Sequence, residues 1–186
     1  MKAGLIGIGL DTYWGQFEGL LGHLNGYREE IGRRIEQMGV EVTDAGMVDN
    51  PVRAQEAAAL FSRNDVEIIF LVVSTYALSS TVLPVARKVG VPVIVLNLQP
   101  VAQLDYAAFN RMVDRGRMTG VWLEHCQACS VPEIASVFNR AGIRYDIVTG
   151  YLDDPGVWQE IESWCRAGRV VSALSRNRMG ILGHYY

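Results

Sequence analysis

The stretch "AGLIGIGLDTYWGQFEG", residues 3–19, joins a six-residue apolar run to a glycine-flanked polar loop. An unbroken apolar run of this length is typical of a strand buried on both faces of a parallel sheet. We therefore predict a first strand over 3–8. The loop that follows begins like a nucleotide-binding turn, but it then carries side chains too bulky to wrap only a pyrophosphate, namely Asp11, Thr12, Tyr13 and Trp14.

The rest of the chain repeats this unit of apolar run and helical segment. Further strands are predicted over 40–44, 67–73, 91–96 and 145–149. Helical periodicity is predicted over 18–38, 51–63, 79–89, 105–142 (two helices broken near Arg115-Gly116) and 155–174. Such alternation predicts an α/β fold, a doubly wound parallel sheet of flavodoxin-like order 2-1-3-4-5 with helices on both faces.

Composition limits the classes of function. The chain has 186 residues, 49% of them hydrophobic, and a net charge of −3. No Lys/Arg cluster offers a surface for nucleic acid or an anionic membrane, and no apolar stretch approaches the roughly 20 residues of a membrane span. Three cysteines, an odd number, argue against a disulfide scaffold. We predict a cytoplasmic protein with no nucleic-acid or membrane partner.

The C-terminal residues differ from the preceding pattern. "RNRMGILGHYY", residues 176–186, is a sixth apolar run with no helix after it. We therefore predict a flavodoxin-like domain over 1–175, and over 176–186 the first strand of a following domain that is absent.

Ligands of doubly wound sheets bind outside the carboxyl ends of the strands. Four loops are expected to meet there, over 9–17, 45–50, 74–80 and 97–105. Three of them are rich in side chains that bond hydroxyl groups, which favours a small, hydroxyl-rich, uncharged ligand: Asp11, Thr12, Tyr13, Gln16, Ser74, Thr75, Tyr76, Asn97 and Gln99.

Two short motifs have alternative explanations. Gly7-x-Gly9 starts a dinucleotide fingerprint, but Thr12 stands where the third glycine belongs, so close packing of strand and helix is the favoured explanation. Cys126-x-x-Cys129 fits a redox dithiol or half of a zinc site. No second ligand pair matches it, and inside a helix the two thiols share a face, so buried structural thiols are favoured.

The sequence resembles the N-terminal region of L-arabinose isomerase-like proteins, in the L-arabinose/L-fucose isomerase family. The resemblance implies a longer three-domain protein that assembles as a trimer or hexamer and interconverts aldoses and ketoses with a divalent metal, Mn²⁺. It is carried by "GLIGIGLDTYWGQFEGL", "VSTYALSSTVLPV", "PVIVLNLQPVAQLDY", "CQACSVPEIASVFNRAGI", "VTGYLDDPGVWQEIESW" and "RMGILGHYY".

The same resemblance implies which residues touch the sugar. Neither catalytic nor metal-binding residues are expected in this chain, because both come from later domains. Cys129 stands where typical L-arabinose isomerases carry a histidine, and a thiol cannot make the hydrogen bonds of an imidazole. By position, the resemblance implies that the loop 11–14 and the segment 127–133 touch the sugar, and the strand-end loops add Gln16, Thr75 and Tyr76. The expected substrate-binding residues are Asp11, Thr12, Tyr13, Trp14, Gln16, Thr75, Tyr76, Gln127, Cys129 and Glu133.

Two main functions therefore compete. The first is the N-terminal domain of a metal-dependent aldose–ketose isomerase, which contributes sugar-contacting loops and subunit contacts and is inactive as an isolated 186-residue chain. The alternative is a non-catalytic flavodoxin-like sugar-binding or assembly module. A nucleotide-dependent redox domain is a third function, disfavoured by the missing glycine.

Overall fold

A computed structural model describes residues 1–178, 180, 182 and 183 of the chain. Its centre is a parallel sheet in the order β2-β1-β3-β4-β5, so the predicted α/β fold and strand order 2-1-3-4-5 are confirmed. The strands are β1 (Lys2–Ile8), β2 (Glu41–Val48), β3 (Ile68–Val73), β4 (Val93–Gln99) and β5 (Tyr145–Tyr151).

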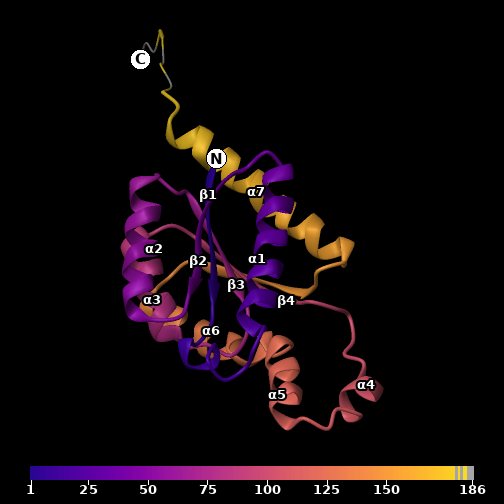
Figure 1. Ribbon diagram of the computed structural model, residues 1–186. Coiled ribbons are helices and arrows are strands. Elements are labelled where there is room, and N and C mark those ends of the chain that lie inside the picture. The colour runs from indigo at the N-terminus through magenta and orange to yellow at the C-terminus, as the bar shows by residue number, and fades with distance from the viewer. Residues whose placement is uncertain (179, 181, 184–186) are drawn as a thin grey trace.

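Helices cover both faces of this sheet (Figure 1). The longer helices α1 (Leu20–Gln37) and α7 (Pro155–Ser175) pack on one face, and α2 (Pro51–Arg63), α3 (Ser79–Val89) and α6 (Val131–Ala141) pack on the other. Two short helices, α4 (Tyr106–Asn110) and α5 (Arg115–Glu124), lie beyond the lower end of the sheet in Figure 1. Two 3₁₀ turns complete the described elements, η1 (Asp11–Tyr13) and η2 (Gln127–Cys129).

The core explains why the apolar runs become strands. All six residues of β3 are buried, and they point alternately into the two apolar layers on either side of the sheet. Phe61 and Phe70 are fully buried in opposite layers. Burial of such a side chain stabilises the fold by about 1.5–3 kcal/mol. The ring of Phe61 lies so close to Gly4 that a Cβ there would stand 2.8 Å from it.

The segment 105–142 differs from its prediction. It holds three helices and a 3₁₀ turn, not two helices broken near Arg115-Gly116. Two aspartates set the starts of the first two helices. The side chain of Asp105 accepts from Ala108 N at the start of α4, and that of Asp114 accepts from Gly116 N and Arg117 N at the start of α5. Gly116 is thus part of the first turn of α5 and not a helix break.

Two further predictions concern the ends and surroundings of the fold. α7 ends at Ser175, and the predicted strand over 176–186 falls partly on 179, 181 and 184–186, outside the described residues, so the domain division stays a prediction. Within the part of the chain that is described, no helix has the length and apolar character needed to span a membrane.

Candidate functional site

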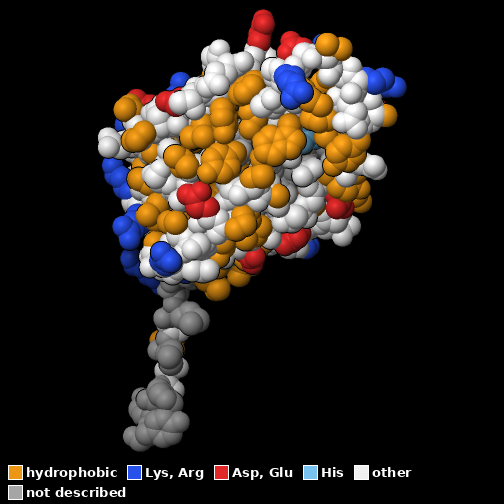
Figure 2. All heavy atoms as spheres, turned by 90° about the horizontal axis from the view of Figure 1, so that it is seen from below, with side chains coloured by type: hydrophobic (Ala, Val, Ile, Leu, Met, Phe, Trp, Pro, Cys, Tyr) orange, Lys and Arg blue, Asp and Glu red, His pale blue; other side chains and the backbone are white. Residues whose placement is uncertain are grey.

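The carboxyl ends of the five strands point to one face of the molecule, shown in Figure 2. Hydrophobic side chains gather across the middle of this face, with acidic and basic groups between and around them. The loops after β1 and β3 and the segment from α5 to α6 meet here. This is the edge at which the sequence predicted a ligand.

The first loop is held by a tryptophan. Trp14 Nε1 donates a hydrogen bond of 2.7 Å to Oδ2 of the buried Asp49, at the end of β2. Its ring lies over Gly9, where an added Cβ would stand 2.7 Å from Trp14 Cη2. Tyr13 packs edge-on against it. Trp14, predicted to contact the sugar, is half-buried and hydrogen-bonded within the protein.

Several predicted sugar-binding side chains hold the loop after β3. Thr75 is fully buried, and its hydroxyl donates to Leu123 O at 2.7 Å. Gln127 donates to Ser74 O at 3.0 Å.

Glu133 completes this set of contacts on the other side of the loop. Its Oε1 accepts from both Ser79 N and Ser79 Oγ, at 3.1 and 2.6 Å. The structure therefore uses Thr75, Gln127 and Glu133 to fix the backbone of the edge.

Other predicted residues come together beside this framework. Cys126, directly before η2, faces Cys129 at the end of η2, and Tyr13 lies near them and near Tyr76. Burial, and then the negative charges that Cys126, Tyr76 and Cys129 carry when ionised, raise the pKa of Tyr13. Asp11 and Thr12 are exposed on η1. Whether any of these residues binds substrate stays a prediction.

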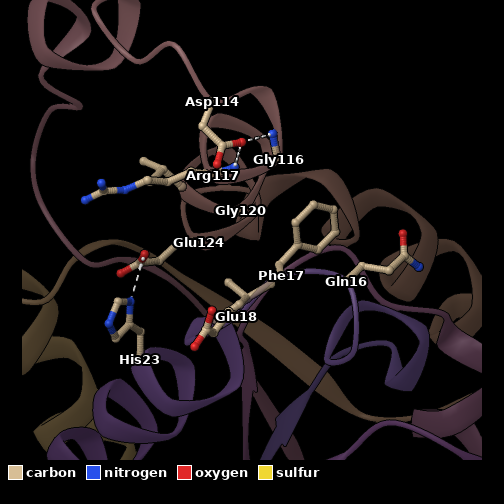
Figure 3. Close-up of a pocket in the computed structure, with 11 residues that line it drawn as sticks. Gln16, Phe17, Glu18, His23, Asp114, Gly116, Arg117, Gly120 and Glu124 are labelled. Carbon is tan, nitrogen blue, oxygen red and sulfur yellow. Dashed lines mark hydrogen bonds and ion pairs between the residues drawn. The ribbon is translucent and has the colours of Figure 1, made fainter.

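A cavity of about 480 Å³ opens between the first loop and α5 (Figure 3). Of the predicted residues, Gln16 lines it, although its amide donates to Thr12 O at 2.7 Å. The loop and α1 supply Phe17, Glu18 and His23 to its wall, and α5 and its cap supply Asp114, Arg117 and Glu124. In Figure 3 these side chains stand around the opening, with Phe17 on one side and Arg117 and Glu124 on the other.

Glu124 is the most constrained of these groups. Its side chain is 13% exposed, its Oε1 accepts from the Tyr27 hydroxyl, and its Oε2 lies 3.2 Å from His23 Nδ1. Burial, followed by the hydrogen bond to Glu124, raises the pKa of Tyr27 well above its ordinary value. Tyr27 therefore stays a hydroxyl donor, and it fixes the carboxylate of Glu124 at the wall of the cavity.

The charges of the cavity wall are unequal. Three carboxylates, on Glu18, Asp114 and Glu124, face one guanidinium, on Arg117, so the wall carries −2 when His23 is neutral. Among the described residues Arg117 has no side-chain partner, whereas Asp114 is engaged as the cap of α5. The same part of the chain contains no group of three or more His, Cys, Asp or Glu side chains arranged to hold a metal ion.

The sequence does not predict that these residues line one cavity. One available signal was the spacing of His23 and Tyr27, which at i and i+4 share a face of a helix. Their partner Glu124 lies about a hundred residues away, and no periodicity connects it to them.

No family model matches the chain, and no curated protein matches it. One similar solved structure, described as an acylhydrolase from Bacteroides fragilis, is 7% identical with a TM-score of 0.43, over 91% of this chain and 87% of that one. Another, a GDSL-like lipase from Bacteroides thetaiotaomicron, is 11% identical with a TM-score of 0.39, over 91% and 88% of the two chains.

These comparisons contradict the predicted family and function. The neighbours are described as hydrolases, and no sequence match supports membership of the L-arabinose isomerase-like proteins. The isomerase activity and the arabinose and manganese expectations that depended on the resemblance are therefore corrected. The physical reason is that a shared pattern of apolar runs and loops is common to many doubly wound proteins, whose chemistries differ.

The weak likeness to hydrolases does not transfer their activity, because both TM-scores lie below 0.5. Serine-type acyl transfer needs a nucleophile within hydrogen-bond reach of a histidine. His23 Nδ1 contacts Glu124 and His125 Nδ1 contacts Val121 O. Within the described chain neither imidazole is hydrogen-bonded to a serine or a cysteine.

Proposed function

We propose that this chain is a binding module for a small, neutral, polyhydroxy compound of the sugar class, held in the cavity between the first loop and α5. The observation that carries the proposal is the fixed carboxylate of Glu124 in a wall that also offers a free guanidinium and an aromatic ring. The volume of about 480 Å³ lies within the range of small-molecule sites.

The wall matches the chemistry of hydroxyl groups. A hydroxyl both donates and accepts, so it can donate to the carboxylates of Glu18 and Glu124 and accept from the guanidinium of Arg117. Phe17 is half-buried beside Gly120, where its ring can cover the apolar C–H face of a sugar. Charged acceptors strengthen such hydrogen bonds to about 1.5–3 kcal/mol each.

The same wall disfavours phosphate. A helix N-terminus is the usual anion site, but the N–H groups of Gly116 and Arg117 at the start of α5 already bond the carboxylate of Asp114. The excess of carboxylates also repels an anion. The proposed ligand is therefore a free sugar or polyol rather than a sugar phosphate or a nucleotide.

Two other parts of the proposal are independent of the cavity. A homo-oligomeric state and a cytoplasmic location both stay proposals. The location is supported by the three cysteines, which are free thiols, as is usual in a reducing compartment.

Titration calorimetry with neutral pentoses, hexoses and their phosphates tests the proposal. We expect a neutral sugar to bind, and Glu124→Gln to weaken that binding by about tenfold or more, at 1.4 kcal/mol per decade. Glu160→Gln, an exposed change on α7, is the matched control and should bind normally. Preference for a sugar phosphate, for a polyamine, or for none of these compounds would refute the proposal.

A further inference from the structure

Two cysteines face each other at the two ends of the 3₁₀ turn η2, where the chain passes from α5 to α6: Cys126 directly precedes the turn and Cys129 is its last residue. Cys126 Sγ lies 2.8 Å from Cys129 Sγ and donates a hydrogen bond to it. Cys126 is buried, whereas Cys129 is exposed. The sequence prediction of two buried thiols on a helix therefore holds for Cys126 alone, and the pair lies in a turn with one sulfur open to solvent.

We propose that Cys126 and Cys129 form a thiol-modification site, which small-molecule disulfides oxidise reversibly to an intramolecular disulfide, with Cys129 as the entry thiol. The site is separate from the cavity described above, and no known activity of the chain uses it.

The surroundings give the two sulfurs different roles. Cys129 is exposed just before the first turn of α6, and it accepts the hydrogen bond from the buried Cys126. An exposed sulfur is the one that an incoming disulfide meets first.

Cys126 has the properties of the resolving thiol. Burial, and then the interaction with Cys129, raises the pKa of Cys126 to about 12. Buried and protonated, it does not attack an external disulfide. Once Cys129 is in a mixed disulfide, it carries no negative charge. One of the causes that raise the pKa of Cys126 is then removed, so Cys126 releases its proton more easily.

The reaction balances without any further reagent. The Cys129 thiolate attacks one sulfur of the small disulfide RSSR, forming Cys129–S–S–R and releasing RS⁻. Cys126 then gives up its proton to solvent or to the released thiolate and attacks Cys129 Sγ, which forms the Cys126–Cys129 bond and expels the second RS⁻. The protein loses two electrons, and RSSR gains them as two thiols.

The backbone is suited to closing this bond. In a 3₁₀ turn the side chains at i and i+3 eclipse each other, which an α-helix does not allow. Cys129 N also bonds Cys126 O at 3.4 Å, which holds the two ends of the turn together. The sulfurs must approach by less than about 1 Å to reach the 2.03–2.05 Å of a disulfide.

The experiment exposes the reduced full chain to glutathione disulfide, quenches it with acid at intervals, alkylates free thiols and maps every cysteine by mass spectrometry. We expect a transient glutathione adduct on Cys129, then a Cys126–Cys129 disulfide that reduced glutathione reverses. In Cys126→Ala the adduct on Cys129 should persist. In Cys165→Ala, the matched control at the other buried thiol, the outcome should equal that of the parent protein.

Three results would overturn the proposal: a first adduct on Cys126 or Cys165, no 126–129 bond in the parent protein, or loss of the adduct from Cys129 in Cys126→Ala. Circular dichroism before each reaction confirms that the variant is folded. If Cys126→Ala does not fold, the order of modification in the parent protein decides, since Cys129 must react before Cys126.

Discussion

His23 Nδ1 on α1 lies 3.2 Å from Glu124 Oε2 on α5, although 101 positions separate the two residues in the sequence. The other oxygen of the same carboxylate accepts from Tyr27, one helical turn after His23. One carboxylate therefore ties the short helix α5 to the long helix α1. The cavity lies between α5, the first loop and the start of α1.

Tyr27→Phe should destabilise the fold and weaken ligand binding. It removes the hydroxyl that bonds Glu124 and leaves one oxygen of a largely buried carboxylate without a protein partner. We expect a loss of about 1–3 kcal/mol in the free energy of unfolding, measured by urea denaturation. Tyr106→Phe removes a hydroxyl from an exposed tyrosine and is the control. Equal effects of the two variants would contradict the role of Tyr27.

Asp114→Ala should open an anion site at the start of α5. The change frees the N–H groups of Gly116 and Arg117 and removes one negative charge from the cavity wall. We expect a stability loss of about 0.5–2 kcal/mol from the lost cap, together with measurable phosphate binding by calorimetry.

Asp105→Ala provides the matched comparison, since it removes the cap of α4, which does not line the cavity. That variant should lose a cap without gaining affinity for phosphate. Phosphate binding in both variants, or in neither, would count against the charge argument.

Gly9→Ala should displace Trp14. The added Cβ would stand 2.7 Å from Trp14 Cη2, so the ring must move and its hydrogen bond to Asp49 is strained. We expect destabilisation of about 1–3 kcal/mol, as for other overpacked sites. Gly15→Ala, in the same loop but with open space around it, should change the midpoint of thermal unfolding little. An unchanged midpoint for Gly9→Ala would show that the loop relaxes freely.

The stability should fall as the pH rises above the ordinary thiol range. Burial raises the pKa of Cys165 to about 11, so the folded protein holds a proton that the unfolded chain releases from about pH 8.5 upward. Stability is complete below that pH and decreases until about pH 11, by on the order of 3 kcal/mol for this residue.

Cys165→Ala should reduce this alkaline loss, which denaturation at pH 7.5 and at pH 10.5 would measure. The variant also leaves a small void at every pH, so the comparison is between slopes with pH and not between absolute stabilities. If the free energy of unfolding fell equally with pH in both proteins, Cys165 would not be the source of the alkaline loss.

Much of the fold could be predicted because it depends on local patterns. The apolar runs at β1 and β3 and the Asn50-Pro51 start of α2 carry their own signals. The end of β4 carries no such local signal. Asn97 and Gln99 are polar, which predicts a loop, but they pair with residues of β5, and that pairing is a tertiary contact.

The candidate site was less predictable for the same reason. The sequence predicts a ligand at the carboxyl edge of the sheet only through a general rule for doubly wound folds. Thr75, Gln127 and Glu133 look suited to a polyol, yet the structure uses them to bond backbone groups of the loops. Glu18 and Arg117 carry no sequence signal, because the cavity that they share forms only when α5 packs on α1.

Backbone NMR of the labelled chain during titration with a neutral sugar shows whether the sugar binds between the first loop and α5. We expect saturable shifts of the amides around the cavity, among them His23, Gly120 and Glu124, and the loss of these shifts in Glu124→Gln. The second, smaller hollow beside α2, lined by Asp44, Arg53 and Arg63, should show none. Saturable shifts at that hollow alone, or no shifts anywhere at millimolar sugar, would show that no neutral sugar binds between the first loop and α5.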